Sequence, residues 1–152
     1  MRAAEVRSKA ERMLAALGLS AAELSILLCD DPTIHALNRT YRGKNKPTDV
    51  LAFAMREGEG AEHANAHSVL GDIIVSLETA ARQASTRART LDAEVTMLLA
   101  HGLLHLLGLD HRTRTEERRM TARTDLLCAA ASSRRVPGSG RASRRTSRPA
   151  HS

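Results

Sequence analysis

The chain has 152 residues, a length typical of one domain with a sizeable buried core. No stretch of about 18 apolar residues occurs, and the first residues, MRAAEVRSKAERML, hold no apolar signal-peptide segment, so we expect neither a membrane protein nor an exported one. We expect a cytoplasmic protein whose two cysteines, Cys29 and Cys128, are reduced.

The net charge of +6 comes from the end of the chain. Residues 132–152 contain six arginines and no acid, whereas residues 1–131 contain 17 basic and 17 acidic residues. Because the end is also rich in Ser, Pro and Gly, we expect a single domain over 1–131 and a disordered tail over 132–152. The tail arginines either tether RNA non-specifically or form a solvated extension.

Only two aromatic side chains occur, Tyr41 and Phe53. This argues against RNA-binding modules that stack several bases on exposed rings, such as an RRM. Any contact with nucleic acid would therefore rest on the electrostatics of the phosphate backbone.

Periodicity and end signals predict the elements of the first third. Apolar residues at helical spacing indicate a helix that Gly18 ends, and Asp31 followed by Pro32 indicates the cap and first position of another. The predicted elements are a helix over 3–17, a buried strand over 24–29, a helix from 32 to about 41, a loop over 42–49 and a strand over 50–55.

The rest of the chain predicts one strand and three helices. Ser76 is predicted to cap the first helix, Thr90 or Leu91 starts the second, and Thr115 before two glutamates is predicted to cap the last. The predicted elements are a loop over 56–68, a strand over 69–75 broken by Gly71-Asp72, and helices from 77 to about 88, from 91 to about 107 and from 116 to about 131. Together these predict an α+β sandwich, a small mixed sheet of three or four strands flanked by about five helices.

Three histidines in the run HGLLHLLGLDH, residues 101–111, have the spacing of a metal site. His101 and His105 are four apart, so on a helix both imidazoles lie on one face, one turn apart. Gly108 can end that helix, because glycine tolerates the left-handed conformation, and His111 can then supply a third nitrogen. Three imidazoles with an open fourth position are typical of a catalytic zinc ion, so we expect one Zn²⁺ per chain.

The spacing matches the zinc-protease pattern HExxHxxGxxH at all ligand positions and at the glycine. The protease carries its general-base glutamate directly after the first histidine, where this chain has Gly102. The pattern therefore predicts metal binding without the base of peptide hydrolysis.

A basic loop and two aspartates are the remaining candidates. Arg42, Lys44 and Lys46 lie within five residues, and they form either a phosphate-binding loop or a solvated turn. Asp72 stands inside an apolar strand, where it caps a backbone group, pairs with an arginine or supports a ligand histidine. Asp110 is a turn residue, a support for His111 or a proton-transfer group. We keep both aspartates as candidates that hold the metal-binding histidines in place.

Three blocks in this order carry a family resemblance: TYRGKNKPTDVLAF at 40–53, LGDIIVS at 70–76 and HGLLHLLGLDH at 101–111. They resemble the bacterial YbeY family, rRNA maturation factors described as single-strand-specific endoribonucleases, over roughly residues 20–130. The resemblance implies a small mixed sheet with a metal at the base of a positively lined cleft. It also implies that the three histidines are the metal ligands and that Arg42, in the family's Tyr-Arg-Gly position, is the arginine tied to activity.

The chain departs from the family pattern at several positions. Ala52 and Ala54 stand where the family usually has Ser and Pro, and Leu109 stands where Tyr or His is common. The family usually has a strand before its first helix, whereas this chain starts with the helical pattern. The arginine-rich tail is not part of the family core.

The resemblance implies a metal-dependent endoribonuclease of rRNA maturation, notably of the small-subunit 3′ end, and of ribosome quality control. The expected partners are rRNA, through its phosphate backbone, and the ribosomal small subunit, with no membrane and no DNA. A ribosome-assembly factor with a structural zinc remains open, because few aromatics and a neutral body predict weak affinity for free RNA. A zinc protease is the third alternative, and Gly102 argues against it.

Overall fold

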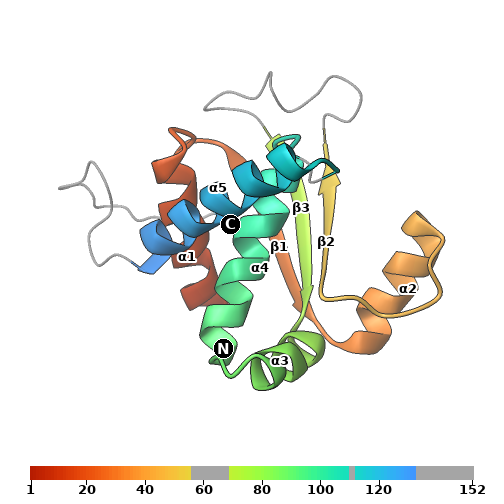
Figure 1. Ribbon diagram of the computed structural model, residues 1–152. Helices are drawn as coiled ribbons and strands as arrows, with labels where there is room; N and C mark the ends of the chain where they lie inside the picture. Colours follow the sequence, from red (N-terminus) through yellow and green to blue (C-terminus); the bar gives the residue numbers. More distant parts are fainter. Residues whose placement is uncertain (56–68, 110–111, 133–152) are drawn as a thin grey trace.

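A three-stranded mixed sheet with helices on both faces forms the part of the chain that the computed structural model describes, residues 1–55, 69–109 and 112–132. This confirms the predicted α+β sandwich (Figure 1). In chain order the elements are α1 (Ala3–Ala16), β1 (Glu23–Cys29), α2 (Asp31–Arg42), β2 (Val50–Ala54), β3 (Val69–Ser76), α3 (Leu77–Thr86), α4 (Leu91–Leu106) and α5 (Arg114–Ser132). The predicted loop over 56–68 and the tail after residue 132 lie outside the described residues.

The sheet has the strand order β1-β3-β2. β1 runs parallel to β3, and β2 runs antiparallel to it, with Leu51 opposite Ile74. Figure 1 shows α4 against one face of the sheet and α2 beyond the other. β2 is therefore an edge strand with helices on either side of it.

Two apolar clusters hold these layers together. The larger lies between the sheet and the helices α1, α4 and α5, and Ile73, Val75 and Leu103 are among its fully buried members. The smaller joins α2 to the other face of the sheet through Ile34, Leu51 and Ile74. The alternation of strand residues between faces accounts for this division, since Ile73 and Ile74 are neighbours that face opposite ways.

Three predicted helix boundaries differ from the structure by a residue or two, and a side-chain contact explains the first. Asp30, not Asp31, caps α2, because its carboxylate accepts a hydrogen bond from the Thr33 amide at 3.0 Å. α2 runs one residue further than predicted, to Arg42, and Gly43 ends it with a φ of 70°. α3 ends at Thr86, before the predicted 88.

The last helix begins at Arg114, earlier than predicted, because Thr113 and not Thr115 caps it. The Thr113 hydroxyl accepts a hydrogen bond from the Glu116 amide at 3.0 Å, and the Glu116 carboxylate accepts one from the Thr113 amide at 3.1 Å. This is a capping box, a reciprocal pair that satisfies amides at the start of a helix.

The predicted break at Gly71-Asp72 is also wrong, because β3 continues through it. The pairing with β1 shifts between Glu23 and Leu24, which leaves an extra residue on β3 beside Gly71. Gly71 has a φ of 138°, and a Cβ there would lie 2.1 Å from the Phe53 carbonyl oxygen. The glycine therefore allows a bulge where the pattern suggested an interruption.

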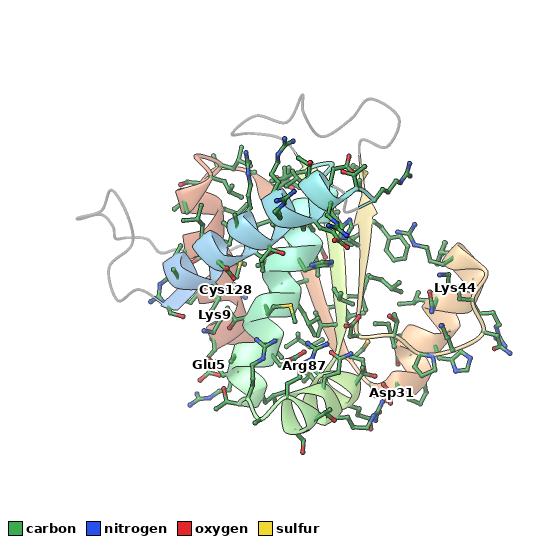
Figure 2. The ribbon with its side chains drawn as sticks, in the orientation of Figure 1. Glu5, Lys9, Asp31, Lys44, Arg87 and Cys128 are labelled. Atoms are coloured by element: carbon green, nitrogen blue, oxygen red, sulfur yellow. The ribbon has the colours of Figure 1, made fainter. Side chains whose placement is uncertain are left out.

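Asp31 joins the start of α2 to the end of β3 and the start of α3. Its carboxylate accepts hydrogen bonds from the Ser76 hydroxyl at 2.6 Å, the Thr79 hydroxyl at 2.6 Å and the Arg82 guanidinium at 2.7 Å. The hydrogen bonds from Ser76 and Thr79, with the charge of Arg82, lower the pKa of Asp31 to about 2. Figure 2 shows Asp31 at one end of α2 and Lys44 just past the other.

We predict that Asp31→Asn lowers the free energy of unfolding at pH 7 by about 1–2 kcal/mol, allowing for solvent screening of a partly exposed carboxylate. A depressed carboxylate pKa stabilises the fold above its unfolded pKa, and this contribution is lost as pH falls from about 4 through about 2. Urea unfolding of variant and wild type should therefore differ at pH 7 and converge near pH 2. Asp30→Asn is the control, because asparagine caps helices as well as aspartate. A difference that stays constant down to pH 2 would contradict the prediction.

Among the described residues, no helix is long and apolar enough to cross a membrane.

Candidate active site

α4 carries the predicted metal-binding histidines. From Glu94 to Leu106 every residue is buried except Met97, His101 and His105, which are partly exposed and four residues apart. These three therefore form the one stripe of this segment that reaches the surface. His101 and His105 lie on the same partly exposed face of an otherwise buried helix segment, so both imidazoles point toward the same space.

Two anchors fix the start of α4. The Thr90 hydroxyl accepts a hydrogen bond from the Ala93 amide at 3.0 Å, so Thr90 caps the helix and Leu91 is its first residue, which confirms the predicted start at Thr90 or Leu91. Glu94 is completely buried and forms ion pairs with Arg87 at 2.8 Å and Arg89 at 3.5 Å. The two arginines come from the segment that connects α3 to α4, so the helix is held against its neighbour.

The two imidazoles converge at their Nε2 atoms. Nε2 of His105 lies 3.2 Å from Nε2 of His101, and the ring centroids are 4.8 Å apart. Two nitrogens bound to one zinc at about 2.0–2.1 Å in tetrahedral geometry are about 3.3 Å apart. The donor pair of α4 therefore has the separation that a shared metal ion requires.

The predicted third ligand, His111, and its neighbour Asp110 lie outside the described residues. Within the described part of the chain, no three His, Cys, Asp or Glu side chains gather as a possible metal site. The turn that leads toward residue 111 is described. Gly108 has a φ of 90°, and its amide and that of Leu109 donate to the carbonyls of His105 and Leu104. The predicted helix end at Gly108 is confirmed.

Gly102 brings α4 close to the sheet. A Cβ at this position would lie 3.0 Å from Cγ2 of Ile73 on β3, and Gly102 itself is buried. The side chain that a zinc protease carries here would have to enter a packed core. The absence of the protease glutamate thus has a packing reason as well as a chemical one.

We predict that Gly102→Glu lowers the free energy of unfolding by at least about 2 kcal/mol, because the added side chain overpacks the contact with Ile73 and buries a charge. Urea unfolding measures this. As a control, Gly102→Ala should cost less in an Ile73→Ala background than in the wild type, because Ile73→Ala removes the atoms that the new methyl group meets. Additive effects of these two alanine substitutions would show that the contact is not tight.

Arg42 lies at the outer edge of β2, at the end of α2. Its Nη2 donates a hydrogen bond to the Ala52 carbonyl oxygen at 2.6 Å, and its guanidinium carbon stands 4.9 Å from the centre of the Phe53 ring. The second contact is a cation–π interaction. Two contacts therefore fix the planar group, while the Arg42 side chain as a whole remains exposed.

The basic loop after Arg42 is fastened to α2. Asn38 is buried, and its side-chain Nδ2 donates a hydrogen bond to the Lys46 backbone carbonyl at 2.9 Å. The backbone carbonyl of Asn38 accepts a hydrogen bond from the Lys44 amide at 3.2 Å. His35 Nε2 lies 2.8 Å from Oδ1 of Asn45. Lys44 and Lys46 themselves are exposed. These hydrogen bonds fix the backbone of the loop, which carries the two exposed lysines. A solvated turn would not need such bonds, so they favour a phosphate-binding loop.

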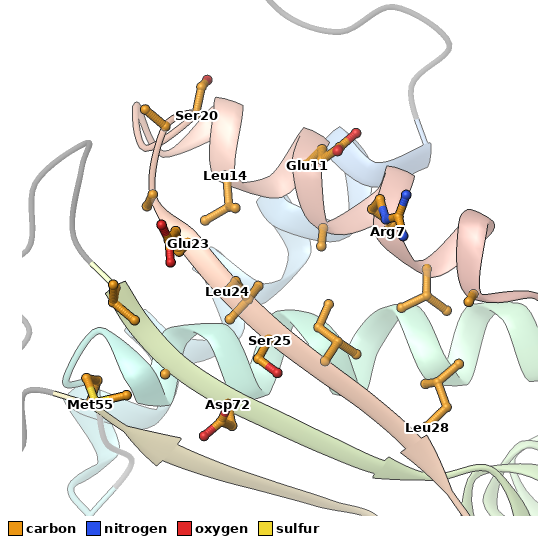
Figure 3. A pocket seen from close by; sticks show the side chains of 18 residues that line it. Arg7, Glu11, Leu14, Ser20, Glu23, Leu24, Ser25, Leu28, Met55 and Asp72 are labelled. Atoms are coloured by element: carbon orange, nitrogen blue, oxygen red, sulfur yellow. The ribbon is translucent and has the colours of Figure 1, made fainter. Parts of the chain in front are cut away.

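Asp72 is not brought to the histidine pair. It pairs with Ser25 of β1 and Phe53 of β2 in the sheet, on the face opposite that of Ile73, which packs against α4. It lines a groove of about 750 Å³ between α1 and β1, in which Figure 3 shows it beside Ser25. Neither described histidine of the pair nor Arg42 lines this groove. The position of Asp72 in the sheet therefore does not support the role predicted for it beside the metal site.

Comparison with known proteins decides the family. Residues 2–132 match the family model described as Endoribonuclease YbeY. The chain belongs to the YbeY family. A YbeY protein of Anaeromyxobacter sp. is 49% identical over 118 residues, covering 78% of this chain and 59% of that protein. One of Aquifex aeolicus is 46% identical over 113 residues, covering 74% and 72%. Both are named Endoribonuclease YbeY.

The match spans different shares of these YbeY relatives, and in the Anaeromyxobacter protein less than two thirds of its length. The solution structure of TM1509 from Thermotoga maritima is similar to this chain with a TM-score of 0.62 at 22% identity, over 84% of this chain and 81% of that one. At that identity the likeness concerns the fold, and it agrees with the α+β architecture.

Sequence reasoning missed the supports of Arg42. The Ala52 carbonyl and Phe53 lie ten and eleven residues further along the chain, and Asn38 was not singled out. The alternation in 50–54 places Phe53 on the same face as Leu51, toward α2. The alternation thus predicts on which face of the sheet Phe53 lies, but it does not predict that the Arg42 guanidinium stacks on its ring.

Proposed function

We propose that this protein is a metal-dependent, single-strand-specific endoribonuclease that acts on rRNA, notably at the 3′ end of the small-subunit rRNA, and in ribosome quality control. One observation carries the proposal: the Nε2 atoms of His101 and His105 converge to 3.2 Å in a family whose members bear the name endoribonuclease. The expected partners are rRNA and the ribosomal small subunit, in the cytoplasm, without a membrane or DNA.

The metal that fits this donor set best is one Zn²⁺ per chain, held by His101, His105 and His111. Imidazole nitrogens suit zinc, and two of the three have the separation that it requires. When bound, the ion would supply Lewis-acid activation of water or of a phosphoryl oxygen. Asp110 is the proposed support of this site because of its position next to His111. Asp72 lies on the face of the sheet away from α4 and is not proposed for this role.

Arg42 would be both the catalytic cation and a contact for the substrate. Its guanidinium is held by the Ala52 carbonyl and the Phe53 ring, so its orientation is set before RNA binds. The remaining N–H groups can hold two oxygens of the scissile phosphate and stabilise the charge that develops there. Such preorganised donors commonly contribute about 10²–10³ in rate. Lys44 and Lys46 would contact neighbouring phosphates of the strand.

The attacking group is either water or the 2′-hydroxyl of the RNA itself. Attack by the 2′-hydroxyl leaves a cyclic phosphate on the product, whereas attack by water does not. The ends of the product therefore separate the two routes.

The test is cleavage of a single-stranded 3′-precursor of small-subunit rRNA by the purified wild type, His111→Ala, His105→Ala and Arg42→Lys. We expect cleavage by the wild type and a loss of about 100-fold or more in each variant. The histidine variants lack a proposed metal ligand, and in Arg42→Lys lysine cannot replace the planar fork of arginine. Arg39→Lys is the matched control, since Arg39 is an exposed arginine one turn earlier on α2. It should retain activity within about threefold.

Equal cleavage by the wild type and the histidine variants would mean a contaminating nuclease and would contradict the proposal. Absence of cleavage in every sample, with rRNA processing in cells rescued by Arg42→Ala, would favour the ribosome-assembly factor instead. Turnover of a casein substrate would be needed to revive the protease alternative.

A further inference from the structure

The fold brings together the only two aromatic side chains of the chain. The rings of Tyr41 and Phe53 have centroids 5.6 Å apart and planes inclined by 66°, an edge-to-face contact. Tyr41 nevertheless remains 65% exposed. A sequence with so few aromatics argues against a surface of several stacked rings, but it leaves room for a single ring in one chosen place.

That place is next to Arg42. Arg42 and Tyr41 are neighbours at the end of α2, and both contact Phe53, the first at 4.9 Å and the second at 5.6 Å from the centre of its ring. In an edge-to-face pair at least one face of each ring is not covered by the other. Phe53 presents a ring face to the guanidinium, whereas most of Tyr41 is exposed to solvent.

We propose that Tyr41 forms a stacking subsite for one nucleobase of single-stranded RNA, beside the phosphate that Arg42 holds. This inference rests on the proposed function, because it takes the RNA strand as the ligand. Every base has a π-face, so the subsite accepts any of the four bases. The ring is already packed on Phe53, and Asn38 holds the loop that follows its helix. Little conformational entropy is therefore lost when a base binds.

The charges around Tyr41 favour a nucleic acid over an apolar partner. Arg42 and Lys44 follow it within three residues, and both are exposed. A phosphate chain on these cations would place a base within reach of the ring, as in proteins that bind single strands through a basic groove with interspersed aromatics. A base inside a duplex is already stacked and paired, so this subsite gives a physical reason for a preference for single strands.

The composition of the chain makes the subsite directly measurable. Tyr41 is the only tyrosine and there is no tryptophan, so the intrinsic fluorescence of the protein comes from this ring. We would titrate the zinc-loaded full chain with a 2′-O-methyl single strand, and with an abasic strand of equal length and charge. Anisotropy of a dye on the strand reports binding independently of the tyrosine signal.

We expect saturable quenching of the tyrosine emission by the base-bearing strand, and binding without comparable quenching by the abasic strand. Binding of both strands with equal quenching, or binding of the base-bearing strand with none, would overturn the proposal.

Variants separate stacking from simple covering of Phe53. Tyr41→Leu keeps an apolar cover but has no ring, and it should weaken binding of the base-bearing strand about tenfold while leaving the abasic strand unchanged. Tyr41→Trp should bind as well as the wild type. If Tyr41→Leu binds both strands like the wild type, Tyr41 only covers Phe53 and the proposal is wrong.

These results are independent of the cleavage test. Cleavage that depends on His105 and Arg42, together with no base-dependent quenching, would leave the proposed function standing and remove the subsite. Base-dependent quenching without any cleavage would leave the subsite standing as part of an RNA-binding protein and remove the proposed enzyme activity.

Discussion

The close approach of α4 to β3 at Gly102 is the constraint on which the candidate site depends. Because this residue has no side chain, the helix lies against Ile73, and almost all of its second half is buried. The burial leaves only one narrow stripe of the helix in contact with solvent, and His101 and His105 occupy it. A bulkier residue at 102 would move the helix away from the sheet and displace the two imidazoles with it.

β2 links the two halves of the site. α4 packs on one face of this five-residue strand through the larger core, in which Ala52 and Ala54 take part. On its other side Arg42 reaches from α2 to the Ala52 carbonyl and the Phe53 ring. A short edge strand with small side chains toward α4 and an aromatic toward α2 therefore lies between the helix that carries the histidine pair and the arginine. Edge strands usually need protection from unwanted pairing, and here a charged side chain on a backbone carbonyl contributes it.

The sequence predicted those parts of the site that depend on local signals. The start of α4 at Thr90 or Leu91, the position of His101 and His105 on one face of it and the turn at Gly108 each follow from a few neighbouring residues, and all three are confirmed. The choice between Asp30 and Asp31 as the cap of α2 could not be made locally. It depends on Ser76, Thr79 and Arg82, which bind Asp31 from more than forty residues away.

The supports of Arg42 were out of reach for a similar reason. Nothing in the order of residues shows that the guanidinium of Arg42 will lie over the Phe53 ring, on the face of the sheet opposite α4. The sequence did not predict the bulge at Gly71 either, because glycine next to a charged residue in an apolar run is as typical of a break in a strand as of a bulge. Local patterns thus placed the two candidate histidines, while tertiary contacts determined how the arginine is held.

The central claim is that a metal at the histidine pair is required for cleavage of RNA. The most direct measurement is the cleavage rate of metal-stripped protein during titration with zinc, with His105→Ala in parallel. We predict no activity at the start, a linear rise to one equivalent of zinc per chain and a plateau beyond it, with no response in the variant. Full activity of the stripped protein, or an equal response of His105→Ala, would contradict the account.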